Sequence, residues 1–132
     1  MADKQQVSNL VESARKSLKE SDFVRALSLA KEALLIDPNH VTALFVLGAT
    51  QRRAGQSIDA EKTMLRVVDS VPQLAAAYQE LGLNYLGRGQ LKKAKKALRM
   101  SLQQDASLPA SWRYLGQVLA SEGDEEGAAE AY

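Results

Sequence analysis

The sequence has no cysteine, one histidine, three prolines and few aromatic residues among its 132 residues. Without cysteine there is no disulfide, no thiolate nucleophile and no thiolate metal site. His40 has no partner residues placed near it by sequence, so its most economical role is structural. We therefore expect no metal, no cofactor and no catalytic residue.

The sequence also lacks long apolar runs and a large net charge of either sign. No run approaches the ~20 residues that a membrane-spanning helix needs. The formal net charge is +1, which gives no bulk argument for a nucleic-acid or membrane partner. The first residues have no basic start followed by an apolar core, so we expect no secretory signal and a cytoplasmic location.

Two patterns that could suggest chemistry have simpler explanations. Glu125 and Glu126 fall where a helix is expected to start, and acidic residues are favourable at that end of a helix. The glycines of GLNYLGRGQ are not followed by the Lys-Ser or Lys-Thr of a phosphate-binding loop. We interpret them as packing and turn residues, and the sequence predicts no enzyme activity.

A period of 34 residues dominates what the sequence does contain. Several columns of identical residues share this period. They are Gly48, Gly82 and Gly116; Gly55, Gly89 and Gly123; Ala26, Ala60, Ala94 and Ala128; Leu47, Leu81 and Leu115; and Pro38 and Pro72. Each copy reads as two short amphipathic helices with a turn between them, because apolar residues recur three, four and seven positions apart.

The helix signals divide the chain into an all-α series. Helices are expected at about 6–19, 23–36, 41–54, 57–70, 73–86, 90–104, 109–121 and from 125 onward, with the polar residues before Gln6 frayed. Gly55, Gly89 and Gly123 stand where a left-handed residue ends a helix. The column Gly48, Gly82 and Gly116 lies inside helices, where glycine costs about 1 kcal/mol relative to alanine. We expect it to permit close approach of the paired helix, with the alanine column as the facing surface.

These columns resemble the tetratricopeptide repeat, whose pattern is W-x2-L-G-x2-Y, then A-x3-F, then P. The third copy reads Tyr78, Leu81, Gly82 and Tyr85, then Ala94 and Leu98. The first copy is degenerate in its leading helix, where Ser13 and Ser17 are expected to lie on an exposed outer face. The resemblance implies a right-handed superhelical solenoid of antiparallel helix pairs, forming one domain with repeats at about 7–40, 41–74, 75–108 and 109–132.

The resemblance also implies a function, which is binding a peptide or partner protein in a concave groove lined by the first helix of each pair. Residues one step round from the core stripe are expected there, including Val11 and Ala49. The candidate groove residues are Arg15, Lys19, Phe45, Arg52, Arg53, Gln79, Leu83, Arg113 and Gln117. The clustered cations suit an acidic peptide or a free carboxylate, because arginine binds carboxylates bidentately. Ordinary solvated side chains are the alternative interpretation.

Chaperone-binding members of this family hold a terminal carboxylate with a clamp of lysine, asparagine and arginine. The matching positions here are Val11, Arg15, Val46, Ala76 and Glu80. Four of them lack the donors of that clamp, and Glu80 would repel a carboxylate. The resemblance therefore argues against chaperone C-terminal peptides as ligands.

A basic run and the end of the chain complete the sequence-based expectations. The run comprises Arg88, Lys92, Lys93, Lys95, Lys96 and Arg99. We interpret it as a solvated face, with nucleic-acid or anionic-surface binding as the alternative, disfavoured because no aromatic residues interleave for base stacking.

The fourth repeat is truncated at Tyr132, so we expect a fragment of a longer protein. Trp112, Leu115 and Leu119 should be partly uncovered, and the C-terminal end should self-associate or fray. The last ten residues also resemble the repeats that precede the catalytic domain of bacterial repeat-containing sulfotransferases. The alternative function is thus an N-terminal regulatory or docking domain of such a larger enzyme.

Overall fold

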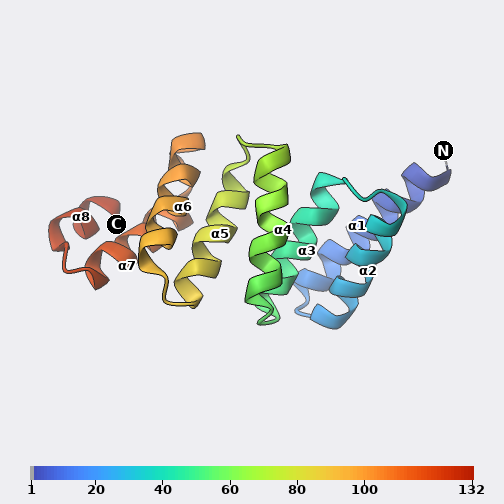
Figure 1. Ribbon diagram of the computed structural model, residues 1–132, viewed down its shortest axis with the longest axis horizontal. Coiled ribbons are helices and arrows are strands. Elements are labelled where there is room, and N and C mark those ends of the chain that lie inside the picture. Colours follow the sequence, from blue (N-terminus) through green and yellow to red (C-terminus); the bar gives the residue numbers. More distant parts are fainter. Residues whose placement is uncertain (1) are drawn as a thin grey trace. The chain divides into compact units, whose positions relative to one another are not determined.

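The computed structural model describes residues 2–132, and these residues form eight α-helices and no strand (Figure 1). The helices are α1 (Ala2–Lys19), α2 (Phe23–Ile36), α3 (Val41–Arg53), α4 (Ser57–Ser70), α5 (Ala75–Gly87), α6 (Leu91–Gln104), α7 (Pro109–Ser121) and α8 (Glu125–Ala131). Short turns join them in pairs, α1 with α2 through to α7 with α8. The expectation of an all-α repeat of helical hairpins is confirmed.

Two helix starts differ from the expected ones by more than one residue. α1 begins at Ala2 and not near Gln6, because its first residues contain no helix breaker and the Gln5 amide donates to the Asn9 side chain at 3.0 Å. α5 begins at Ala75 and not at Gln73. The Tyr78 hydroxyl donates to the Pro72 carbonyl at 2.8 Å, which holds the preceding loop outside the helix.

The helices fall into two compact units, the first ending at Val71 and the second beginning at Pro72. In the first unit, α1 packs on α2 and α3, α2 packs on α3, and α3 packs on α4. In the second unit, α5 packs on α6 and α7, α6 packs on α7, and α7 packs on α8. Each unit therefore contains two hairpins whose first helices touch.

Close approach within the hairpins occurs at the predicted glycines, where the nearest atoms belong to a large side chain. A Cβ atom on Gly82 would lie 2.7 Å from Leu98 Cγ, and one on Gly48 would lie 2.9 Å from Met64 Cε. A Cβ on Gly116 would lie 3.1 Å from the Tyr132 ring. The large residue four positions after each alanine thus lies nearest to the glycine, and of the expected alanine column the Ala94 carbonyl oxygen lies 3.6 Å from a Cβ on Gly82.

The expected exposure of Ser13 and Ser17 is also wrong. Ser17 is buried and Ser13 is half-buried. The Ser17 hydroxyl donates to the Ser13 carbonyl at 2.9 Å, so the buried hydroxyl keeps a hydrogen bond. Because α1 lies against both α2 and α3, this face of the helix points into the core.

Each turn between paired helices contains one residue in the left-handed backbone conformation. The left-handed residue is Gly in three of them, and Ser21 takes that place in the first, with φ 61°. The next residue is the N-cap of the second helix, and its side chain caps that helix where it is aspartate. Asp22 accepts a hydrogen bond from the Arg25 backbone N–H at 3.2 Å, and Asp124 accepts one from Gly127 at 2.9 Å. Gln56 stands at the equivalent place before α4 and makes no side-chain cap.

His40 has a structural role, as the sequence indicates. It is the N-cap residue of α3, and its Nδ1 accepts a hydrogen bond from the Ala43 backbone N–H at 3.1 Å. This contact satisfies one of the unpaired donors at the start of the helix.

The expected exposure on α7 is wrong for two of three residues. Leu115 and Leu119 are buried, and only Trp112 is exposed. α8 packs against α7, and the Tyr132 ring lies over Gly116. The Trp112 indole N–H donates to the Ala106 carbonyl at 2.7 Å, which fixes the ring at the edge of the core.

The glycine contact predicts a position-specific loss of stability. Gly82→Leu should lower the free energy of unfolding by about 1–3 kcal/mol, because the new side chain would overlap Leu98. Thermal and urea denaturation followed by circular dichroism would measure it. Gly87→Ala is the control on the same helix, since nothing lies within 4 Å of a Cβ there. An equal effect of the two substitutions would contradict the packing argument.

The cap comparison predicts a gain in stability. Gln56→Asp should raise the free energy of unfolding by about 1 kcal/mol, because Gln56 (φ −89°, ψ 64°) has nearly the backbone conformation of Asp22 (φ −88°, ψ 80°). The reverse exchange, Asp22→Gln, should cost a similar amount. Urea denaturation of both variants tests the pair, and a destabilised Gln56→Asp protein would show that the two turns are not equivalent.

Candidate functional site

The candidate site in the first unit lies on the first helices of its two hairpins. We define the α1/α3 surface as Arg15, Lys19, Phe45 and Arg52. Arg15 and Lys19 are exposed on α1, whereas Phe45 and Arg52 are half-buried on α3. α1 and α3 touch directly, so this surface combines cations from both helices with part of one aromatic ring.

Val11 and Ala49, which were expected to face the groove, are buried in the core. α3 packs against α1, α2 and α4 at once, and every residue from Leu47 to Gln51 is buried. A helix with three neighbours exposes only a narrow stripe. Val11 and Ala49 therefore face the core and cannot contact a ligand in a groove.

Arg53 is engaged with the neighbouring turn. Its guanidinium donates to the Leu18 carbonyl and to the Ser21 hydroxyl, both at 3.2 Å, and lies 5.1 Å from the centroid of the Phe23 ring. These contacts join the end of α3 to the turn between α1 and α2. They give Arg53 a structural explanation that does not need a ligand.

The remaining predicted groove residues lie in the second unit, on α5 and α7. Gln79 and Leu83 are half-buried, whereas Arg113 and Gln117 are exposed. The Arg113 guanidinium lies 5.1 Å from the centroid of the Tyr114 ring. α5 and α7 touch, so these residues belong to the first-helix side of their own unit, as the α1/α3 residues do.

Buried polar contacts were missed by the sequence analysis. Ser111 donates to the Gln79 side chain at 2.8 Å and lies 2.9 Å from the Ser101 hydroxyl, and Ser101 donates to the Ala75 carbonyl. In the first unit, Thr63 donates to the Gln51 side chain at 2.7 Å. A usable signal was Gln51 at the motif's tyrosine position, because a polar residue on a core stripe needs a partner. Gln79 thus serves the fold at least in part.

Asp105 is held by hydrogen bonds in a turn of the second unit. Hydrogen bonds from the Ser107 side chain and backbone lower the pKa of Asp105, which lies in the exposed turn between α6 and α7. This arrangement stabilises the turn. No group of three metal-ligating side chains occurs within residues 2–132.

No helix in the part of the chain that the structure describes combines the length and the apolar character that crossing a bilayer requires.

Comparison with known proteins gives several solved structures of the same fold. MamA residues 41 to the end from Desulfovibrio magneticus RS-1 matches with a TM-score of 0.86 at 28% identity, over 95% of this chain and 71% of that one. The Sgt2 TPR domain from Aspergillus fumigatus matches with a TM-score of 0.83 at 20% identity, over 91% and 81%. Thermobaculum terrenum O-GlcNAc transferase (mutant K341M) matches with 0.86 at 21% identity, over 90% of this chain and 23% of that one.

The last two are less than 25% identical and show likeness of fold alone. No curated protein matches the sequence. The family model described as Tetratricopeptide repeat matches residues 17–82, which is half of the chain. Together with the helical hairpins, the 34-residue period and the glycine contacts, this match shows that the chain belongs to the tetratricopeptide repeat family.

Proposed function

We propose that this chain is a non-catalytic protein-interaction module whose α1/α3 surface binds a peptide or an exposed segment of a partner protein. The ligand carries a carboxylate next to an apolar side chain. The observation that carries the proposal is the exposure of Arg15 and Lys19 and their lack of an ion-pair partner among the described residues.

Geometry and charge suit such a ligand. Arg15 and Lys19 are four residues apart on α1, so they lie on one helix face and reach the same side. The half-buried ring of Phe45 lies on α3, which packs against α1, and offers apolar contact area on the same pair of helices. Arginine binds a carboxylate through two parallel hydrogen bonds, and an apolar neighbour excludes water from that contact. The combination favours a mixed acidic and apolar sequence over a uniformly acidic one.

Arg53 is not part of the proposed contact. Its guanidinium already binds the turn between α1 and α2, so its removal affects folding first. This separates it from Arg15 and Lys19, although all of them are cations on the same two helices.

The test uses an array of 12-residue peptides that mix Asp or Glu with apolar residues, with Asn and Gln counterparts. Wild-type protein should bind the acidic members over their amide counterparts. Arg15→Glu with Lys19→Glu should weaken that binding by at least about tenfold, or about 1.4 kcal/mol, because two attractive charges become repulsive. Fluorescence polarisation measures the affinity, and circular dichroism checks that helicity is unchanged.

Two comparison proteins make the result specific. Arg25→Glu with Lys31→Glu changes the net charge equally but on exposed positions of α2, and should bind as wild type. Arg53→Ala should lose about 1 kcal/mol of stability and keep its affinity. Unchanged binding by the Arg15→Glu, Lys19→Glu protein would move the ligand away from the α1/α3 surface.

A further inference from the structure

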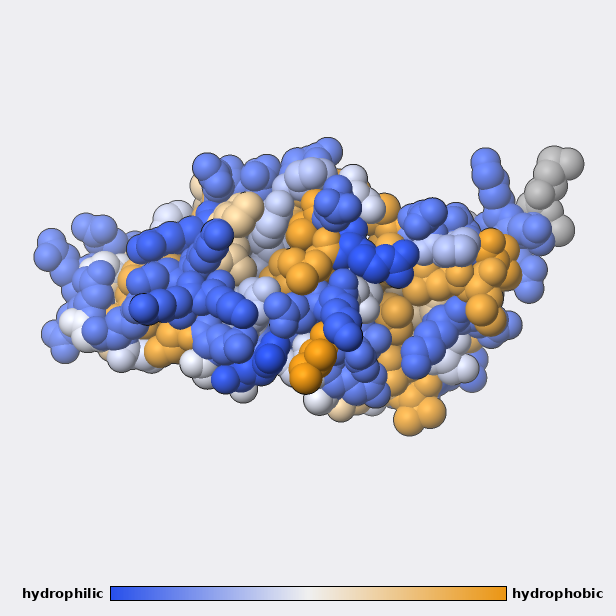
Figure 2. All heavy atoms as spheres, in the orientation of Figure 1, coloured by the Kyte–Doolittle hydropathy of each residue, from blue (hydrophilic) through white to orange (hydrophobic). Residues whose placement is uncertain are grey.

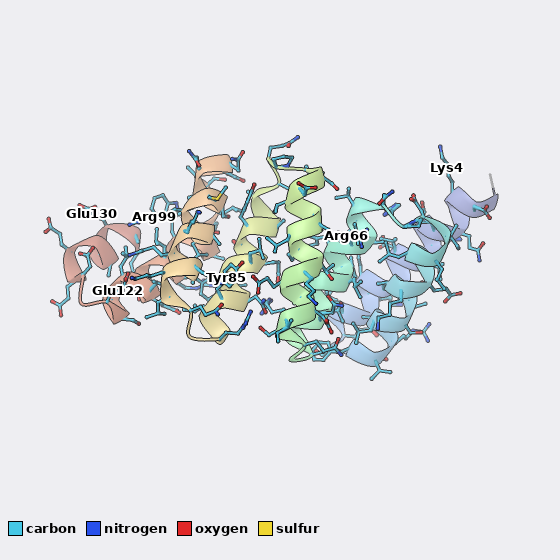
Figure 3. All side chains as sticks on the ribbon, viewed as in Figure 1. Lys4, Arg66, Tyr85, Arg99, Glu122 and Glu130 are labelled. Carbon is cyan, nitrogen blue, oxygen red and sulfur yellow. The ribbon has the colours of Figure 1, made fainter. Side chains whose placement is uncertain are left out.

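The outer face of α6 has a charge pattern found on no other helix of the described chain. α6 carries five cations and no carboxylate, and its first turn has no acidic residue. We define the α6 basic face as Lys92, Lys96 and Arg99. These three residues are exposed and lie four and three positions apart, so they form one stripe. Figure 2 shows hydrophilic side chains covering this helix, and Figure 3 labels Arg99 on it.

Neighbouring residues leave this stripe without a counter-charge. Lys95 alone among the cations of α6 is neutralised, by an ion pair of 2.9 Å with Glu122 at the end of α7. Lys93 lies 5.7 Å from the centroid of the Tyr85 ring. Among the described residues, Lys92, Lys96 and Arg99 have no ionic or hydrogen-bonding partner.

The pattern is unfavourable for the helix itself. Cations in the first turn oppose the helix dipole, and like charges three or four residues apart repel each other. Two of the three equivalent helices have an acidic residue there, Asp59 in the first turn of α4 and Glu125 in that of α8, whereas α2 has none. Local charge conflicts of this kind in a folded protein are characteristic of surfaces that serve a function.

The 34-residue period shows how different this face is. The same outer positions carry Val24, Ser28 and Lys31 on α2, and Ile58, Lys62 and Leu65 on α4. Those stripes mix apolar and charged residues, and Val24 and Ile58 are exposed. The repeat architecture therefore does not require a basic outer stripe, and the need to fold does not explain the cations of α6.

We propose that the α6 basic face binds a short acidic helical segment of a partner protein, with carboxylates at positions i, i+4 and i+7. The stripe from Lys92 to Arg99 spans about 10 Å at 1.5 Å per residue, which is the span of those three positions on a second helix. Packed side by side, the two helices bring each carboxylate to one cation. This surface is additional to the α1/α3 surface and does not depend on it.

Charge around the face limits the size of the ligand. Glu122 adjoins Lys95, and α8 carries Glu125, Glu126 and Glu130 in the same unit. A long polyanion or a flat anionic membrane would extend beyond the stripe and meet Glu122 beside Lys95. A single acidic helix meets only the cations, because it covers one stripe. The surface thus fits a protein segment better than a duplex or a lipid bilayer.

Binding is tested with an alanine-based helical peptide that has Glu at i, i+4 and i+7, and with its Gln counterpart. The Glu peptide should bind wild-type protein with an affinity that falls as salt rises, and the Gln peptide should not bind. Lys92→Gln with Lys96→Gln and Arg99→Gln should weaken binding at least about tenfold. The matched control, Arg25→Gln with Lys31→Gln and Lys62→Gln, removes three exposed cations from α2 and α4 and should keep wild-type affinity.

Two further measurements separate the competing explanations. The α6 triple variant should have a higher melting temperature than wild type, because its charge conflicts are relieved; a lower one would overturn that argument. The Arg15→Glu, Lys19→Glu protein should bind the Glu peptide with wild-type affinity. This result would show that the α6 basic face binds the peptide independently of the α1/α3 surface. Equal peptide binding by the triple variant, or tighter wild-type binding to duplex DNA or to vesicles of anionic lipid, would overturn the proposal.

Discussion

Each of the last three hairpins depends on one close contact, between a glycine on the first helix and a large side chain on the second. Met64 and Leu98 lie so close to Gly48 and Gly82 that a Cβ atom there would require a shift, and Tyr132 makes a slightly looser contact with Gly116. A glycine inside a helix costs about 1 kcal/mol, whereas full burial of a large apolar side chain contributes about 1.5–3 kcal/mol. Met64 and Leu98 are fully buried, so the contact is favourable overall. In the first hairpin, Ala14 and Ala30 occupy the same two positions in one buried cluster.

This packing determines which side chains remain available for binding. α3 has neighbours on three sides, so Val46, Ala49 and Thr50 are buried and the stripe that remains exposed is narrow. Some polar residues of the first helices are also committed to the fold, as Arg53 is to the turn between α1 and α2 and Gln79 is to Ser111. Arg15 and Lys19 carry no such commitment among the described residues, which makes α1 the stronger half of the proposed binding surface.

The second helices of the hairpins differ from one another on their exposed stripes, because the repeat does not constrain the residues there. α2 presents exposed Val24 and Leu35, and Figure 2 shows hydrophobic surface over this helix. α6 presents only cations on the equivalent stripe, and α8 presents carboxylates. The fold tolerates all three, since none of these positions contacts the core. Differences between repeats at such positions therefore carry information about partners that the conserved geometry of the hairpin does not.

The sequence alone determined the helical hairpins, their period and the positions of close approach, because apolar spacing and glycine placement act locally along the chain. It also indicated a structural His40, which proved to be the cap of α3. Only the tertiary structure decided what faces each glycine, that Ser17, Val11 and Leu119 are buried, and that Arg53 holds a turn. Those outcomes depend on how many neighbours each helix has and on contacts between different helices, which for Arg53 join residues 32 and 35 positions apart. A periodic pattern gives the direction of a side chain from its own helix, and the packed neighbours decide whether that direction leads to solvent.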